Sequence, residues 1–164
     1  MNAFSQAMDR IDARIGQVEA FLAKTFLAIQ VAIIFSEVVC RYALGTSLVW
    51  SEELARYLLV WIGFMGASIG LRMRGHFGVE LLVMALPPGL RKVLTCLTIT
   101  VMFIFLGIVT FYGVIMVASA DEVSTVMQVS MRYFYAAIPL GGLFMLVHLF
   151  TMVKRGGLQN FYKV

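Results

Sequence analysis

Four long apolar stretches constrain this chain more than any other feature of its sequence. They cover residues 25–43, 52–72, 93–118 and 132–153 of the 164. A helix needs about 20 residues to cross the hydrocarbon core of a bilayer, and it satisfies its backbone hydrogen bonds without water. Only 13% of the residues are charged, about half the share in an average soluble domain. We therefore predict an all-α integral membrane protein with four transmembrane helices in a single domain, residues 1–164.

The basic residues are distributed unevenly between the two sides of this arrangement. Cations resist translocation, so Lys and Arg accumulate on the cytoplasmic side. With four spans, ten of the 13 basic residues fall on the side that holds both termini. We therefore expect both termini in the cytoplasm, and the net charge of +4 then requires no nucleic-acid partner. The ten are Arg10, Arg14, Lys24, Arg72, Arg74, Arg91, Lys92, Lys154, Arg155 and Lys163.

Two segments outside the spans have patterns of their own. In residues 1–24, apolar residues recur every three or four positions with charged residues between them. This pattern predicts an amphipathic cytoplasmic arm on the bilayer or on a partner, with a solvated extension of the first span as the alternative. Residues 78–86 are apolar but too short to cross, so we expect a short interfacial segment there. Because Glu37 and Arg41 stand where a signal-peptide cleavage site would lie, we expect the first span to be retained.

The sequence contains no pattern typical of catalysis or of a cofactor site. Its two cysteines, Cys40 and Cys96, fall near opposite ends of two different spans, too far apart for a disulfide. Motifs for nucleotide binding, phosphate binding and covalent catalysis are absent. We therefore predict no enzymatic activity, no metal and no cofactor.

The first span contains two charged residues near its predicted outer end. Glu37 and Arg41 are one helical turn apart, with the glutamate first, which favours an intramembrane ion pair. A lone membrane glutamate would instead suit a small proton-coupled exporter. Both readings remain open at this stage.

The predicted outer edge of the second span combines charged and aromatic residues. Ser51 is expected to cap a helix that begins at residue 52, with Glu52 and Glu53 in its first turn, where the helix dipole favours anions. Arg56 is spaced to bridge either carboxylate. Trp50 would serve as an aromatic anchor at headgroup level. The candidates for contact with another subunit or a binding protein at this edge are Arg41, Trp50, Glu52, Glu53 and Arg56.

The predicted inner edge of the second span is basic. Arg72, Arg74 and His76 would anchor this end through lipid headgroups or another subunit, since Glu80 is the only carboxylate nearby in the sequence. A second possibility is a haem held by His76 and His148 in the membrane anchor of a respiratory enzyme.

Small residues mark one face of the second span. Gly63, Gly66, Ala67 and Gly70 form two pairs at the four-residue spacing that lets helices approach closely. They predict helix packing, either within the four-helix unit or against a larger partner. Pro139 should kink the fourth span.

An ordered series of residues resembles the small, DctQ-like membrane subunit of tripartite ATP-independent periplasmic (TRAP) transporters. The resemblance covers roughly residues 20–153, and it departs mildly where relatives often have His-Ile-x-Val-Asp, since this chain has Phe77 and Glu80. The series comprises Arg41, Trp50-Ser51-Glu52-Glu53, Arg56, Trp61, Gly66-Ala67, Arg72, His76-Phe77-Gly78-Val79-Glu80 and Pro87.

The resemblance implies a role in a bacterial inner membrane. In that family, a large membrane subunit carries the substrate and sodium sites, and a periplasmic binding protein delivers a carboxylate-bearing solute. The small subunit is thought to brace the large one and to help form the docking surface. The resemblance therefore implies a non-catalytic scaffold whose partners are the large subunit, the binding protein and membrane phospholipids.

Overall fold

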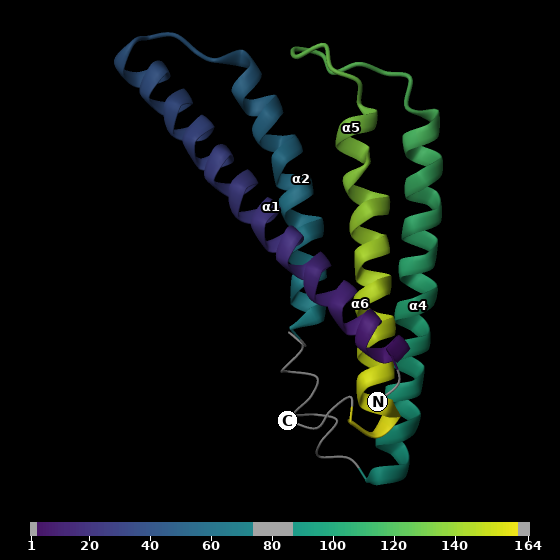
Figure 1. Ribbon diagram of the computed structural model, residues 1–164. Coiled ribbons are helices and arrows are strands. Elements are labelled where there is room, and N and C mark those ends of the chain that lie inside the picture. Colours follow the sequence, from purple (N-terminus) through teal and green to yellow (C-terminus); the bar gives the residue numbers. More distant parts are fainter. Residues whose placement is uncertain (1–2, 74–86, 161–164) are drawn as a thin grey trace.

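The computed structural model describes residues 3–73 and 87–160 (Figure 1). Its helices are α1 (Ala3–Ala43), α2 (Val49–Arg72), α4 (Pro88–Ser119), α5 (Arg132–Tyr135) and α6 (Ala137–Asn160). Four helical stretches in the described chain are long and apolar enough to cross a membrane: Gln6–Ala43, Val49–Arg72, Gly89–Ser119 and Arg132–Lys154. The structure thus confirms the predicted all-α membrane fold with four spans. The expected interfacial segment, residues 78–86, lies outside the described residues.

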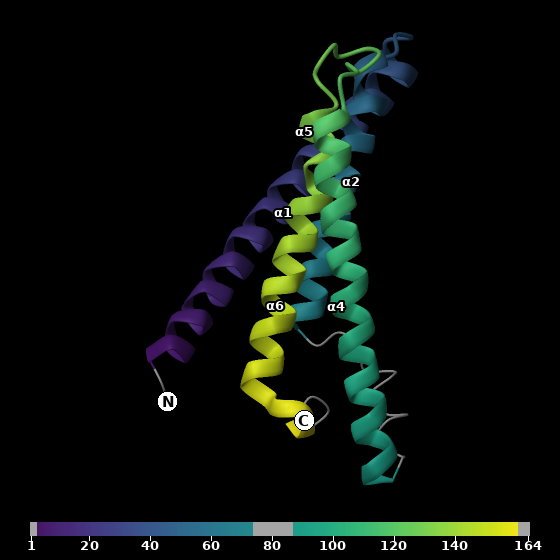
Figure 2. The ribbon, with the colours of Figure 1, turned by 90° about the vertical axis from the view of Figure 1, so that its right-hand side faces the viewer.

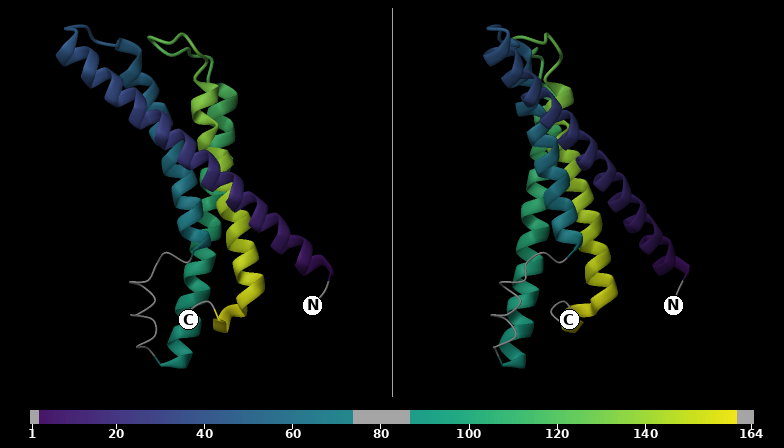
Figure 3. Two further views of the ribbon diagram at one scale, coloured as in Figure 1. Left: turned by 60° about the vertical axis from the view of Figure 1, so that its left-hand side comes forward. Right: turned by 90° about the vertical axis from the view of Figure 1, so that its left-hand side faces the viewer.

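Helix α1 is one continuous helix through both the predicted arm and the first span. Its 41 residues correspond to about 60 Å, twice the thickness of a hydrocarbon core. α1 packs along α2 and then crosses α6 obliquely, so that its N-terminal end stands to one side of the other helices (Figures 2 and 3). Residues 3–24 are therefore an extension of the first span without a break, and whether they rest on lipid or on a partner stays a prediction.

The third and fourth spans pack against each other along their length. α4 begins with Pro88 in its first turn, where proline is tolerated because the first N–H groups of a helix have no acceptor within the helix. The fourth span is divided into α5 and α6 at Ala136. Pro139 lies three residues after the division and lacks the N–H that would bond to the carbonyl of Tyr135, which accounts for the interruption predicted at this proline.

The apolar core lies between α2, α4 and α6. Its buried members are Leu71, Ile99, Leu106 and Leu149. Most other large apolar side chains point away from the molecule, as expected where lipid or another subunit covers the surface.

Glycines bring α6 close to its neighbours. A Cβ on Gly141 would stand 2.7 Å from Cβ of Phe64, and one on Gly142 would overlap Thr110. At Gly63, Gly66 and Gly70, by contrast, an added Cβ would meet no atom within 4 Å. These α2 positions therefore make no close approach within the described chain, and packing of this face against a larger partner stays a prediction.

Candidate functional site

Glu37 joins the end of α1 to the beginning of α2. Its Oε1 accepts hydrogen bonds from Arg41 Nη2 at 2.5 Å and from the Ser47 hydroxyl at 3.0 Å. Its Oε2 accepts from the backbone N–H of Leu48 at 2.8 Å and lies 2.9 Å from the hydroxyl of Ser51. The carboxylate is 12% exposed, and both oxygens are occupied by donors from the loop and from α2. The structure thus contains the Glu37–Arg41 pair within a larger network.

This network changes how α2 begins. The helix starts at Val49 with Leu48 as its N-cap residue, so the expected start at residue 52 is wrong and Ser51 lies inside the first turn. Ser51 does not cap the helix, because its hydroxyl lies 2.6 Å from the Leu48 carbonyl oxygen. Besides Glu52 in the first turn, the carboxylate of Glu37 lies at this N-terminus, where unpaired N–H groups and the helix dipole favour an anion.

Glu53 attaches α2 to the loop between α4 and α5. Its carboxylate accepts hydrogen bonds from the backbone N–H groups of Thr125, Val126 and Met127, each at 3.1 Å. The hydroxyl of Tyr57, one turn further along α2, donates to the same carboxylate at 3.0 Å. Glu53 is therefore occupied by its own chain and does not pair with Arg56.

The loop above Glu53 is a compact turn. Val123 and Ser130 form an isolated antiparallel bridge, and Gln128 between them takes a positive φ of 53°. Arg132 closes the base of the loop, since its Nε donates to the Ala120 carbonyl at 2.9 Å and its Nη2 lies 2.6 Å from Asp121 Oδ1. This loop and the start of α2 together form one edge of the molecule, which we name the outer edge.

Four of the predicted outer-edge residues are accessible. Arg56 pairs with Glu52 at 3.1 Å, and both side chains are largely exposed. Trp50 and Arg41 are also exposed. The outer edge thus offers an aromatic ring and charged groups to a partner, whereas Glu53 is used internally.

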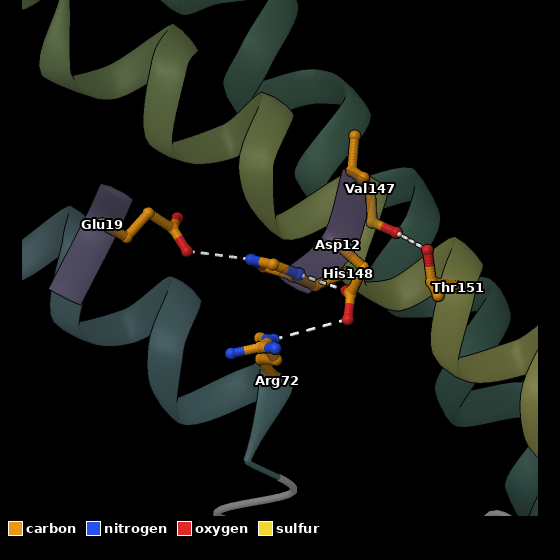
Figure 4. Close-up of polar contacts among 6 residues, drawn as sticks. All are labelled: Asp12, Glu19, Arg72, Val147, His148 and Thr151. Atoms are coloured by element: carbon orange, nitrogen blue, oxygen red, sulfur yellow. Dashed lines mark hydrogen bonds and ion pairs between the residues drawn. The ribbon is translucent and has the colours of Figure 1, made fainter. Parts of the chain in front are cut away.

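A buried charge cluster lies where α1 crosses α6 (Figure 4). The ring of His148 sits between two carboxylates of α1, with Nδ1 2.6 Å from Asp12 Oδ1 and Nε2 2.8 Å from Glu19 Oε2. Asp12, Glu19 and His148 are at most 2% exposed. Arg72 of α2 completes the cluster, with Nε 3.4 Å from Asp12 Oδ2.

Arg72 is the inner-edge residue that the structure places, and its surroundings differ from the expectation. The sequence showed only Glu80 nearby, whereas Asp12, 60 positions away, supplies a carboxylate. Gly16 makes room for the guanidinium, because a Cβ at this position would overlap Arg72 Nη1. Arg74 and His76, like Glu80, lie outside the described residues.

The cluster bears on the haem alternative. Both ring nitrogens of His148 face carboxylate oxygens, so neither is available to an iron atom in this arrangement. Thr151, one turn further along α6, donates to the carbonyl of Val147 at 2.9 Å and does not join the cluster.

The role of the acidic residues of α1 was not predicted from the sequence, which suggested only a polar surface on this helix. The available signal was the seven-residue spacing of Asp12 and Glu19, which puts both on one helix face, with Gly16 between them.

The hollows on the described surface are open grooves with apolar linings. One lies along α1, has a volume of about 600 Å³ and is lined by Lys24, Leu27, Ala28, Val31, Ala32 and Phe35. Another, of about 340 Å³, lies between α2, α4 and α6 and includes Ala67 and Gly70. Neither groove has the convergent polar groups that a solute site would require.

The fold and these clusters define a multi-span membrane protein whose charged residues mainly hold its own helices and loops together. The sequence profile of "Tripartite ATP-independent periplasmic transporters, DctQ component" matches residues 30–156. The chain belongs to this family, whose members are transporter subunits and not enzymes. With its four spans, it is a multi-pass protein of the bacterial inner membrane.

Individual relatives agree with the family. The chain is 28% identical over 149 residues to the ectoine TRAP transporter small permease protein TeaB of Halomonas elongata, covering 88% of this chain and 77% of that protein. It is 32% identical over 100 residues to the C4-dicarboxylate TRAP transporter small permease protein DctQ of Rhodobacter capsulatus, covering 59% and 44%. It is 24% identical over 133 residues to the sialic acid TRAP transporter permease protein SiaT of Haemophilus influenzae, covering 80% and 22%. In three of the curated relatives, the match spans only 22%, 36% and 52% of their length.

Proposed function

We propose that this chain is the non-catalytic scaffold subunit of a sodium-driven TRAP transporter that imports a carboxylate-bearing solute. A large membrane subunit would carry the solute and sodium sites, and a periplasmic binding protein would deliver the solute. The chain would brace the large subunit, with both termini in the cytoplasm. The names of its relatives include sialic acid, C4-dicarboxylates and ectoine, all of which bear carboxylates.

The self-pairing of the charged residues is the observation that supports a scaffold role. A transport site needs polar groups that converge on a cavity and can exchange partners. In the described chain, Glu37 and Glu53 each bind several donors from neighbouring segments, and the grooves are apolar. These carboxylates stabilise the position of α2 and of the outer loop, which suits a static support.

The small residues on one face of α2 favour contact with the large membrane subunit. A Cβ added at Gly63 or at Gly66 would meet no atom within 4 Å. Small residues at four-residue spacing allow a second helix to approach closely in lipid. We assign this face, together with exposed Trp50 and Arg56 at the outer edge, to contacts with the large subunit and the binding protein. Membrane phospholipids would cover the remaining apolar surface and contact the basic inner edge.

Reconstitution in proteoliposomes tests this function. The chain alone should accumulate no sialic acid, succinate or ectoine under a sodium gradient. The same vesicles with the large subunit and the cognate binding protein should take up one of these solutes in a sodium-dependent manner, and omitting the chain should abolish or strongly reduce uptake. Transport by the isolated chain would refute the scaffold role.

The exporter alternative makes a different prediction about Glu37. If Glu37 were a proton site, Glu37→Gln would abolish proton-coupled efflux by a correctly folded and assembled protein. On the scaffold proposal, the substitution weakens the joint between α1 and α2 and lowers the yield of the assembled complex, because Arg41 and the Leu48 N–H lose a carboxylate partner. Measuring complex yield and efflux on the same preparations distinguishes the two.

A further inference from the structure

The buried charge cluster contains more hydrogen-bond contacts than a neutral histidine can make. Each of the two short N···O distances at His148, to Asp12 and to Glu19, requires a hydrogen atom between the two atoms. A neutral imidazole carries one N–H and an ionised carboxylate carries none. One additional proton must therefore reside in the cluster, on the ring or on a carboxyl group. Without it, a ring lone pair would face a carboxylate oxygen.

Burial makes this proton important for the position of α1. Asp12, Glu19 and His148 are almost completely buried, so unpaired charge among them would be costly. With the additional proton, wherever it resides, the four side chains of Asp12, Glu19, His148 and Arg72 carry no net charge. Without it, the same four side chains carry a net charge of −1 in a largely buried place.

The groups around the ring come from each helix packed nearby. α1 supplies Asp12 and Glu19, and α2 supplies Arg72. α4, which packs on α6, begins at the same end of the molecule with Arg91 and Lys92. The two ring nitrogens of His148 contact Asp12 and Glu19 of α1.

The cluster also lies where α1 packs against α2. Asp12 and Glu19 are two turns apart on one face of α1, and Gly16 between them allows the Arg72 guanidinium to lie against the helix. Glu19 Oε1 and Ser68 Oγ are buried without a partner among the described residues. The second carboxylate oxygen of Glu19 is thus available for a further hydrogen bond.

We propose that this cluster is a proton-binding site, and that its bound proton holds the N-terminal half of α1 against α6 and α2. Loss of the proton would release that half of the helix from α6. The proposal does not depend on which solute is carried or on the scaffold role, since it concerns a joint within the chain.

Glu19→Gln provides a direct chemical test. The glutamine amide donates a hydrogen bond to Nε2 of a neutral His148, while Nδ1–H donates to Asp12, so the variant reproduces the hydrogen bonds and net charge of the protonated cluster without the additional titratable proton. His148→Leu is the opposite variant, because it leaves both carboxylates buried without the ring.

The position of α1 can be measured by pulsed electron spin resonance on the full chain in lipid nanodiscs. Spin labels would be attached to the native Cys96 of α4 and to Gln17→Cys on α1, both exposed positions, in a Cys40→Ser background. We expect one short distance at pH 6 and a second, longer population that grows as the pH rises. The ratio of released to docked molecules should increase by about tenfold per pH unit in the range where the docked form holds the proton and the released form has lost it, which is the slope for a single proton.

The variants give the decisive comparison. Glu19→Gln should keep the docked distance from pH 6 to pH 10, and His148→Leu should show the longer population even at pH 6 while circular dichroism retains the helical signal. If the distance between the two spin labels in the chain with the unsubstituted cluster does not change between pH 5 and pH 10, the proposal is overturned. An equal pH response in Glu19→Gln would also overturn it, because that variant lacks the additional titratable proton.

Discussion

At the scale of single residues, the carboxylates of this chain act as links between segments. Glu37 joins α1 to α2, Glu53 joins α2 to the outer loop, and Asp12 and Glu19 join α1 to α6. In lipid a backbone N–H or a cation without a partner is costly, so each link fixes the position of its segment. Glu52, by contrast, is highly exposed and pairs only with its neighbour Arg56.

Glu53→Gln should loosen the outer loop. Glu53 Oε2 accepts two backbone N–H bonds, from Val126 and Met127, and replacing one carboxylate oxygen by an NH₂ group removes acceptor capacity and charge. Hydrogen exchange measured by mass spectrometry should show faster exchange in peptides that contain residues 124–128. Glu52→Gln is the matched control and should leave those peptides unchanged. Equal protection in Glu53→Gln and the parent chain would contradict the role of Glu53.

Gly16→Leu should disturb the cluster at its closest approach. A side chain at position 16 would displace the Arg72 guanidinium and leave Asp12 without one of its cations. Removing one partner of a buried pair costs about 3–5 kcal/mol, and steric overlap adds to this. Urea-dependent unfolding in mild detergent should show the loss, and Gly107→Leu, at a glycine with open space around it on α4, should show little change. Similar stability of the two variants would argue against the close approach of Arg72.

At the scale of elements, α2 has two different faces. Ser51, Ala55, Met65, Ser68 and Leu71 are buried, whereas Gly63, Gly66 and Ala67 are exposed. A face of small residues that contacts nothing in its own chain is expected where another helix packs.

Gly66→Leu should separate folding from assembly. The isolated chain should remain as stable as before or gain about 1 kcal/mol, because leucine favours helix and meets open space. Co-purification of the large subunit should fall, because the leucine side chain prevents a helix of the large subunit from approaching α2 closely. Gly141→Leu is the internal control: it should destabilise the isolated chain by about 1–3 kcal/mol through overlap with Phe64. If Gly66→Leu leaves assembly intact, this face of α2 does not contact the large subunit.

Some of the contacts that hold these elements together could be predicted from the sequence, and others could not. Contacts between near neighbours, such as Glu37–Arg41 and Glu52–Arg56, follow from helical spacing and could be predicted. The contact of Asp12 with His148 joins residues 136 positions apart, and it depends on the angle at which α1 crosses α6. That angle cannot be deduced from one sequence. For the same reason, the sequence could not tell which small residues make close contacts inside the chain, as Gly141 does with Phe64, and which meet open space, as Gly66 does.

At the scale of the whole molecule, much of the surface is apolar and the charged residues gather toward the two ends. α4 exposes Ile104, Phe105, Phe111 and Tyr112, which suits a hydrocarbon environment. A chain with such a surface and no polar cavity among its described residues fits a component that other membrane elements surround.

Membrane topology is testable by cysteine labelling in intact cells. In a Cys40→Ser, Cys96→Ser background, a membrane-impermeant maleimide should label Gln128→Cys in the outer loop from the periplasm. It should label Gln6→Cys in α1 only after the cells are opened, because the basic residues near both termini favour the cytoplasmic side. The reverse pattern would place both termini in the periplasm and contradict the proposed orientation.

The most direct test of the central claim is native mass spectrometry of the tagged chain, gently extracted from its native membrane. A scaffold subunit should be recovered in a defined complex with the large TRAP membrane subunit. Dissociation of the complex should release the two types of chain in equal numbers. Recovery only as a homo-oligomer, together with solute movement by that homo-oligomer in vesicles, would contradict the account.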